Sequence, residues 1–367
     1  MKLFKLFALA AALVILASGS ALAFHDGGVA ECAGCHTMHN SDDGMQVGDN
    51  PIGNEYLLKV GNASDTCLSC HASYGQFYGG LGYGPGGDFY WLTRDYSWSA
   101  HGHTTYSYGD NHGHNIVSPA NGLEADITLT EAPGGDFLST YLRCTSCHDP
   151  HGNQNFRLLY GTDMGPVYNG GRYDFDNPAP EAVGNSRRTM VGGGGNETDA
   201  QHTVYKNGMS EWCANCHTNF HSDNTTNFVH PTGENLGSTI AAAYNAYIST
   251  DETVGGDPTT AFWGLVPFEA VNVDLETVDP TNYTQGPAGT DQVMCLSCHR
   301  AHASAFANAG RWDFGETFIA DSHPQPTDTG WSQDDADNMY YEYTFVTNQR
   351  SLCNKCHVKD LGDAPLE

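Results

Sequence analysis

The stretch Phe24–Asn40, FHDGGVAECAGCHTMHN, contains a CxxCH motif, in which a histidine directly follows the second of two cysteines. The motif occurs six times and uses all 12 cysteines of the chain. Its copies are Cys32, Cys35 and His36; Cys67, Cys70 and His71; Cys144, Cys147 and His148; Cys213, Cys216 and His217; Cys295, Cys298 and His299; and Cys353, Cys356 and His357. Such a motif attaches a c-type haem through its two thiols, and its imidazole takes one axial position on the iron. The sequence therefore predicts six covalently bound haem c groups.

Disulfides and zinc knuckles are the two alternative uses of so many cysteines. Neither explains why a histidine follows every second cysteine of the chain. Haem attachment explains both the spacing and the histidine, so we expect all 12 cysteines to carry haem.

Residues 1–23 have the pattern of a secretory signal peptide. Lys2 and Lys5 form the charged start, Leu6–Ala17 the apolar core and Ala21–Ala23 the small-residue cleavage site. A membrane-spanning helix is the alternative, but the apolar run is short and no stop-transfer pattern follows it. No cysteine at the cleavage site supports a lipid anchor. We therefore expect a secreted protein in which residues 24–367 form a single hexahaem cytochrome c unit.

Apolar periodicity is weak along most of the chain, which contains 43 Gly and 16 Pro. Haems are large, flat and apolar, so six of them can supply most of a core. We expect a mostly irregular, coil-rich multihaem cytochrome c with short helices, wrapped around a chain of six haems. The expected helices lie at the haem motifs, with Ser210 capping EWCANCH and Asp291 capping QVMCLSCH, and at Ile240–Ile248.

Three stretches predict turns or loops. The sequence PGGDF occurs at Pro85–Phe89 and again at Pro133–Phe137, and glycines fill Gly192–Gly195. No Gly-Lys-Ser/Thr and helix follow PGGDF, so a turn is favoured over a phosphate-binding loop. The acidic run Asp334–Asn338 is expected to be a solvated loop, with calcium binding as the alternative.

The role of each haem depends on its second axial position. A histidine there makes the haem an electron carrier, whereas an empty position lets it bind a substrate. The chain has 18 histidines, enough for six distal ligands beside the six in the motifs. His39, His151 and His302 each follow a motif histidine by three residues. A residue so close stays on the same side of its own haem, so we expect each of these to bind the iron of another haem.

Three further histidines complete the expected set of distal metal ligands: His25 beside the first motif, His114 in GHNIV and His230 in VHPTG. The last two stand in turn-prone settings that can present an imidazole to a buried iron. His221, four residues after His217, is the reserve. The remaining histidines lie in polar loops and are expected at the surface: His101, His103, His112, His202 and His323.

The net charge is −28, from 15 Lys and Arg against 43 Asp and Glu. This charge makes nucleic acid and anionic membrane surfaces poor partners. No CxxCH motif is a variant, whereas a multihaem reductase usually keeps one haem with a variant motif or without a distal histidine. The residues therefore favour an electron conduit that is not an enzyme. A soluble periplasmic electron carrier is the first alternative, and a multihaem reductase is the less favoured one.

Several segments together resemble the OmcS-type hexahaem cytochromes, outer-surface proteins of metal-reducing bacteria that polymerise into conductive filaments. These segments run from Phe24 to Asp360 in the order of the family: FHDGGVAECAGCHTMHNS, GHNIV, APGGDF, CTSCHDPHG, GMSEWCANCHT, CLSCHRAHAS and LCNKCHVKD. The loops Gly82–His112 and Asn153–Gln201 are much less alike. The resemblance implies an unbranched chain of bis-histidine haems that carries electrons towards extracellular acceptors, such as metal oxides, partner cells or other cytochromes.

The resemblance also implies a head-to-tail contact between identical subunits. In the family, the histidine just after the first motif ligates a haem of the next subunit. In this sequence that residue is His39, and the receiving haem is the fifth, on Cys295, Cys298 and His299. Such a contact is heterologous, and an open heterologous contact generates a filament.

Overall fold

The computed structural model describes residues 32–71, 85–100, 102–184, 202–220, 232–259, 266–332, 335, 339–340, 345 and 348–356. The predicted signal peptide lies outside these residues, as do the loop Gly192–Gly195 and the histidines His25, His101, His221, His230 and His357. In the described ranges, no helix is long and apolar enough to cross a membrane.

The described chain is mostly coil and turn, interrupted by short helices and four separate two-stranded antiparallel sheets. The α-helices are α3 Cys32–Cys35, α4 Ala63–Leu68, α6 Met209–Cys213, α7 Gly237–Ala246 and α8 Cys295–Cys298. The sheets pair β1 Ser41–Asp42 with β2 Met45–Gln46, β3 Tyr96–Ala100 with β4 His103–Ser107, β5 Val167–Tyr168 with β6 Gly171–Arg172, and β7 Glu181–Val183 with β8 Val204–Asn207. The 3-10 helices are η1 Glu55–Leu57, η2 Phe89–Thr93, η3 Gly109–Asn111, η4 Pro119–Asn121, η5 Ser139–Tyr141, η6 Cys144–Ser146, η7 Phe156–Leu158, η9 Thr218–Phe220, η10 Pro280–Asn282, η11 Ala307–Ala309, η12 Ile319–Asp321 and η13 Leu352–Lys355. The predicted fold class, an irregular chain with short helices, is confirmed.

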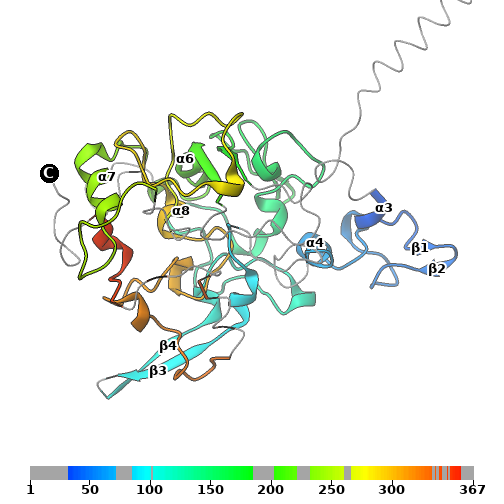
Figure 1. The fold of residues 1–367 in the computed structure, drawn as a ribbon. Coiled ribbons are helices and arrows are strands. Elements are labelled where there is room, and N and C mark those ends of the chain that lie inside the picture. The colour runs from blue at the N-terminus through cyan, green and yellow to red at the C-terminus, as the bar shows by residue number, and fades with distance from the viewer. Residues whose placement is uncertain are drawn as a thin grey trace, which may run out of the picture.

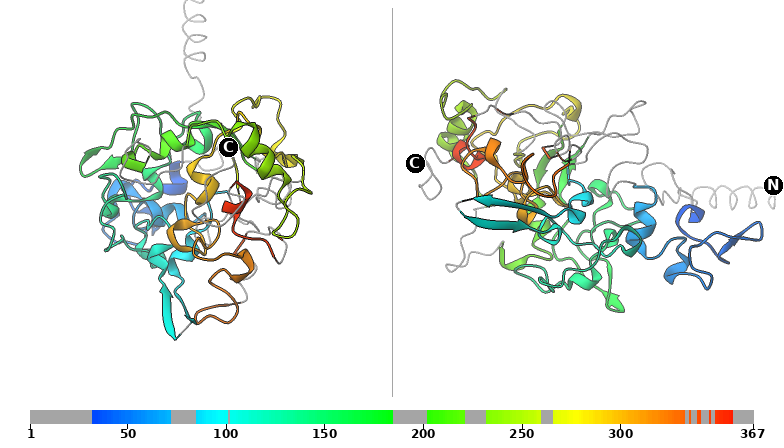
Figure 2. Two further views of the ribbon diagram at one scale, coloured as in Figure 1. Left: turned by 90° about the vertical axis from the view of Figure 1, so that its left-hand side faces the viewer. Right: turned by 90° about the horizontal axis from the view of Figure 1, so that it is seen from below.

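The first and the last motif lie at opposite ends of the molecule. Figure 1 shows the segment with α3, β1 and β2 standing apart from the main body, while the C-terminal η13 lies beside α7 on the far side. The right view of Figure 2 agrees, and both of its views show the β3–β4 hairpin projecting from the body.

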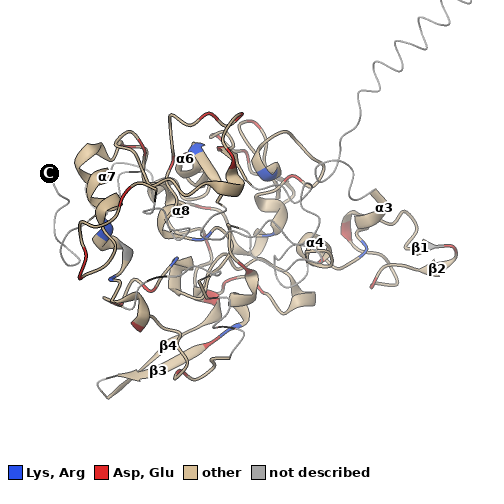
Figure 3. Ribbon diagram, in the orientation of Figure 1, with Lys and Arg blue, Asp and Glu red and all other residues tan. Residues whose placement is uncertain are grey.

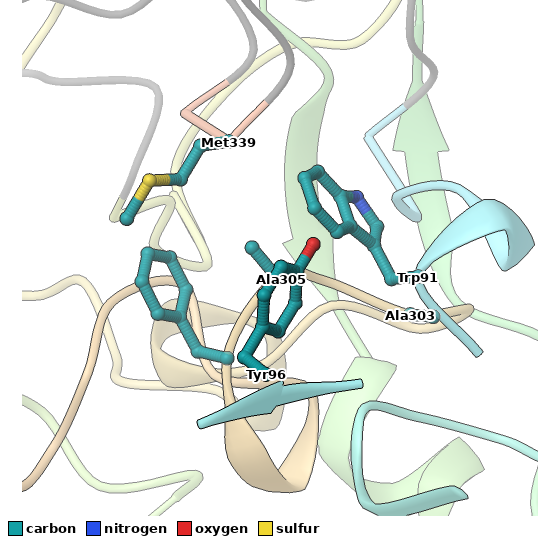
Figure 4. Packing of buried hydrophobic residues seen from close by; sticks show 6 residues of the cluster. Trp91, Tyr96, Ala303, Ala305 and Met339 are labelled. Atoms are coloured by element: carbon teal, nitrogen blue, oxygen red, sulfur yellow. The ribbon is translucent and has the colours of Figure 1, made fainter. Parts of the chain in front are cut away.

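Among the described residues, the buried apolar side chains form four small clusters instead of one continuous centre. One cluster contains the fully buried Trp91 with Tyr96, Ala303, Ala305 and Met339 (Figure 4). The other three pack against motif cysteines: Cys298, Cys353 and Cys356; Cys144; and Cys213. The protein's own apolar side chains thus surround the haem attachment points, as expected if haems complete the core.

The helix at α7 was expected to span 240–248, and the structure places it at Gly237–Ala246. Its start is earlier because Gly237, with φ of 77°, allows a left-handed turn directly before Ser238. The helix buries Ala241, Tyr244 and Asn245 along one face. The expected helix is confirmed, with its bounds shifted towards the N-terminus.

The two predicted N-caps are wrong. The left-handed Gly208 precedes α6, and the Ser210 hydroxyl instead accepts a hydrogen bond from the Cys295 backbone N–H at 3.1 Å. The Asp291 carboxylate accepts from the Ala288 N–H at 2.7 Å, three residues upstream of its own position. Both side chains make tertiary or turn contacts, which compete with capping for the same oxygen atoms.

The prediction of a solvated loop around Asp335 is also wrong. This residue is fully buried and accepts hydrogen bonds from Arg94 Nη2 at 2.9 Å, Tyr90 Oη at 3.0 Å and the Ser332 N–H at 2.7 Å. The carboxylate therefore ties the C-terminal segment to the base of the β3–β4 hairpin. The other members of the acidic run lie outside the described residues.

We expect Asp335→Ala to lower the free energy of unfolding by about 3 kcal/mol, because it leaves Arg94 partly buried without its counter-charge. The measurement is the denaturant midpoint followed by circular dichroism. Asp174→Ala is the control, because Asp174 pairs with Arg172 at the exposed surface, where an ion pair contributes about 0–1 kcal/mol. Equal effects of the two substitutions would contradict the anchoring role.

A second prediction concerns Glu269, which is buried and accepts a hydrogen bond from the Met209 N–H at the start of α6. Burial raises its pKa to about 7, so the folded state holds a proton that the unfolded state releases near the ordinary glutamate pKa. Stability should therefore fall as the pH rises from about 4.5 to about 7.5, by about 3 kcal/mol at most. In Glu269→Gln this part of the pH dependence should disappear. An unchanged pH profile, measured by thermal unfolding, would contradict the raised pKa.

Candidate functional site

Each described CxxCH motif closes into one helical turn. The histidine N–H donates to the carbonyl of the first cysteine in five motifs, at 2.9–3.1 Å; the donors are His36, His71, His148, His217 and His299. This i to i−4 bond brings the two cysteines, three residues apart, onto one face. The prediction of short helices at the motifs is confirmed, and both thiols can address one edge of a haem.

Neighbouring motifs are fastened together in pairs. The Cys144 N–H donates to the Ser64 hydroxyl at 3.2 Å, and the Cys295 N–H donates to Ser210 at 3.1 Å. Each serine lies three residues before the first cysteine of the preceding motif. The contacts join the second motif to the third and the fourth to the fifth, so that haems attached there would lie close together.

The cysteines are free thiols, and no disulfide joins any two of the 12, all of which lie in the described ranges. Burial raises the pKa of Cys147 and of Cys298 to about 12. Both cysteines are only partly buried, so their thiols are available as attachment points. The disulfide alternative receives no support from the structure.

Six of the predicted ligand histidines have their rings held in the same way. Nδ1 of each donates to a main-chain carbonyl: His36 to Tyr56 at 2.9 Å, His114 to Ala301 at 2.6 Å, His148 to Arg157 at 2.8 Å, His217 to Pro133 at 2.8 Å, His299 to Asn308 at 2.8 Å and His302 to Gly87 at 3.1 Å. A carbonyl oxygen can only accept, so the proton must be on Nδ1 and Nε2 carries a free lone pair. Metal-binding histidines are held in this way in proteins.

Five of these six rings face another predicted ligand histidine. The ring centroids are 6.2 Å apart for His36 and His151, 6.3 Å for His148 and His302, and 5.9 Å for His114 and His217. Two imidazoles that share one metal at about 2.0 Å from each nitrogen have centroids about 6.3 Å apart. The structure therefore brings the first, third and fourth motif histidines opposite His151, His302 and His114, at the separation that an iron between them requires.

The surroundings of two of these rings favour the neutral form. Desolvation by the surrounding protein lowers the pKa of His114 to about 4 and that of His302 to about 3, so both imidazoles are neutral at pH 7 and keep the lone pair that a metal needs. The donor set and its spacing fit covalently attached haem.

Three of the predicted ligands in the described residues are exposed, namely His39, His114 and His151. His39 lies in the projecting N-terminal segment, and none of the described residues is hydrogen-bonded to its ring. The His151 side chain is 70% exposed, although its ring lies opposite His36. Exposure of His39 is consistent with a ligand for another molecule.

Three histidines expected at the surface are instead enclosed by the fold, and these predictions are wrong: His112 and His202 are buried, and the His323 side chain is only 11% exposed. His112 is fully buried and uses both ring nitrogens, donating from Nδ1 to Trp91 O at 2.9 Å and accepting at Nε2 from Ser107 Oγ at 2.7 Å. His202 is also buried, and His323 stacks on Trp98 and is bonded to Asp328. Polar neighbours in sequence do not show that a ring is enclosed by residues from elsewhere. His103 is exposed, as expected.

Both PGGDF sequences form turns, as predicted, and each supplies a carbonyl to a ligand histidine. Gly87 O accepts from His302, and Pro133 O accepts from His217. The glycines allow this close approach, because a Cβ on Gly135 would lie 1.8 Å from Cys216 O. The repetition of PGGDF was the sequence signal for this role, which the sequence analysis did not recognise.

No protein-family model matches the chain. The chain is similar to the c-type cytochrome OmcS of Geobacter sulfurreducens, with 36% identity across 96% of this chain and 98% of the relative. Among solved structures, it is similar to the outer membrane cytochrome S filament of the same organism, with a TM-score of 0.78 and 35% identity over 92% of this chain and 100% of that chain. A cryo-EM structure of OmcS nanowires gives a TM-score of 0.75 and 34% identity at the same coverage. Sequence and fold are thus alike over nearly the whole length.

We expect Gly135→Ala to disturb the second PGGDF turn, because its Cβ would clash with the main chain of the fourth motif. The clash should cost about 2 kcal/mol of stability and move Pro133 O away from His217. Thermal unfolding and the electron paramagnetic resonance spectrum of the haems measure the two effects. Gly171→Ala, where the nearest atom is 3.8 Å from the added Cβ, is the control and should behave as the parent protein.

Proposed function

The chain belongs to the family of the c-type cytochrome OmcS, and from that premise we propose that six haems, one on each CxxCH motif, conduct electrons along a filament of identical subunits. The protein is an extracellular, outer-surface cytochrome that polymerises into such filaments. Residues 24–367 form one hexahaem unit, and electrons leave it towards extracellular acceptors. The protein catalyses no reaction of its own on a bound substrate.

The ligand set follows from the ring pairs. His151 serves the first haem, His302 the third and His114 the fourth. His25 and His230 then serve the second and sixth haems, and both lie outside the described residues. When bound, each haem supplies an iron centre that exchanges one electron; bis-histidine ligation gives it a lower potential than a methionine ligand would. The chain orients the imidazoles and covers the rings with apolar side chains.

One observation supports the contact between subunits. The first, third and fifth motifs each carry a histidine three residues after the motif histidine, and these histidines follow one rule. His151 of the third motif faces the first motif's histidine, and His302 of the fifth motif faces the third motif's histidine. Each therefore serves the haem of the preceding odd-numbered motif. Applied to His39 of the first motif, the rule requires a preceding motif in another subunit, and the fifth motif with His299 is the equivalent one.

The position of the first motif supports the same contact. The N-terminal segment extends from the body at the end opposite η13 (Figure 1) and exposes large apolar side chains: Met38, Met45, Ile52, Tyr56 and Leu57. Apolar side chains gathered on one projecting segment are typical of an interface. Acidic side chains are spread over the described surface and basic ones are few (Figure 3), so this docking depends on apolar contact and on the His39–iron bond more than on charge pairing.

We expect His39→Ala to keep six haems, since attachment depends only on the CxxCH residues. It should leave one haem per subunit without its sixth ligand and prevent filament formation. The measurements are the intact mass, the high-spin signal in electron paramagnetic resonance, and electron microscopy of the secreted protein.

His103→Ala is the matched control, because His103 is also an exposed histidine, on β4. It should form filaments with six low-spin haems. Normal filaments from His39→Ala would rule out the proposed contact. A parent protein that stays monomeric with six low-spin haems would instead favour the soluble periplasmic carrier, and a large high-spin fraction in intact parent protein would favour a reductase.

A further inference from the structure

The first, third and fifth motifs are three copies of one structural module. In each module, two main-chain hydrogen bonds join the motif to a later segment. One is made by the residue that follows the motif histidine, and the other by the second cysteine of the motif. In the third motif the Asp149 N–H donates to Leu158 O at 2.8 Å, and the Tyr160 N–H donates to Cys147 O at 3.0 Å. In the first motif the equivalent bonds run from the Thr37 N–H to Leu57 O and from the Lys59 N–H to Cys35 O. In the fifth motif they run from the Arg300 N–H to Ala309 O and from the Arg311 N–H to Cys298 O. These four bonds are 2.7–2.9 Å long.

Each later segment contains two consecutive residues in the left-handed region. The pairs are Tyr56 and Leu57, with φ of 55° and 58°; Arg157 and Leu158, with 49° and 58°; and Asn308 and Ala309, with 58° and 54°. The first residue of every pair provides the carbonyl that accepts from the motif histidine's Nδ1. A left-handed pair therefore sits beside the haem ligand in all three modules.

This backbone is unfavourable for the residues that adopt it. In the described chain, the other non-glycine residues with positive φ are Asn or Asp, which tolerate this region well. Five of the six residues in the pairs are instead tyrosine, arginine, leucine or alanine, for which the left-handed conformation costs about 1–2 kcal/mol per residue; Asn308 is the exception. Strain that recurs at equivalent places beside functional groups points to a functional requirement.

We propose that the three left-handed pairs are positioning residues, which turn a main-chain carbonyl towards Nδ1 and so fix the plane and the proton of the motif histidine at the first, third and fifth haems. The inference rests on the proposed haem attachment at these motifs. A hydrogen-bonded Nδ1–H makes the imidazole a more basic ligand, which favours the oxidised iron. The pairs therefore hold the potentials of these three haems below the values they would have without the carbonyl.

Asn308 allows the clearest test, because it is exposed, its replacement disturbs little packing and it lies outside the projecting segment proposed for docking. Asn308→Val places a β-branched residue where φ is positive, which is strongly disfavoured, whereas Asn308→Gly removes the same side chain and suits that φ. The full-length secreted holoprotein of each variant is compared with the parent by intact mass, redox titration and electron paramagnetic resonance. Leu158→Val and Leu158→Gly repeat the comparison at the third haem.

We expect every variant to carry six haems. In each Val variant one haem should shift to a higher potential with a changed low-spin signal, while the Gly variants should match the parent and be at least as stable. Val variants with parental potentials would overturn the inference, as would Gly variants that shift as the Val variants do, or a shift spread over all six haems. A parent protein with fewer than six haems would contradict the proposed function instead, so the two failures are distinguishable.

Discussion

The hydrogen bond from a histidine Nδ1 to a main-chain carbonyl is the interaction on which this structure depends. It is made by six of the predicted ligand histidines, and it determines which ring nitrogen remains for the metal. The acceptors come from different places: left-handed pairs, both PGGDF turns and the chain beside His302. Much of the irregular backbone therefore positions imidazole rings. This explains how a chain with little regular structure keeps one conformation.

The sequence specified the chemistry of this chain better than its geometry. Covalent attachment follows from Cys32, Cys35 and His36 and their repeats, because the spacing directly determines which side chains share a helical turn. The interpretation that His151 and His302 serve other haems required only that a nearby residue stays on one side of its ring. The pairing of each with a particular motif could not be derived, because it depends on folding over more than a hundred residues.

The errors share a cause. Ser210, Asp291 and Asp335 are polar residues whose local sequence fits a cap or a solvated loop. Ser210 and Asp335 instead make tertiary contacts, and Asp291 accepts from the Ala288 N–H in the turn that precedes it. His112 was taken for a surface residue because its neighbours in sequence are polar, yet both its ring nitrogens are bonded within the core. Periodicity and capping rules describe chains that build their core from helices and strands. Here the described apolar side chains form only small clusters, three of which pack against attachment cysteines.

The left-handed pairs bear on how such a chain can change over evolutionary time. The functional atom at these positions is a carbonyl oxygen, which every amino acid has, so side-chain identity is free to drift: NEYLL and NFRLL still look alike, whereas the third copy reads FANAG. A duplicated segment can therefore become unrecognisable by sequence while its backbone stays the same. Each copy contains its own attachment motif and its own left-handed pair. The histidine three residues after its motif histidine is directed to the copy before it. Such a segment is a self-sufficient unit of growth, and a gene that gained one more copy would encode a longer conductor without redesign of the rest.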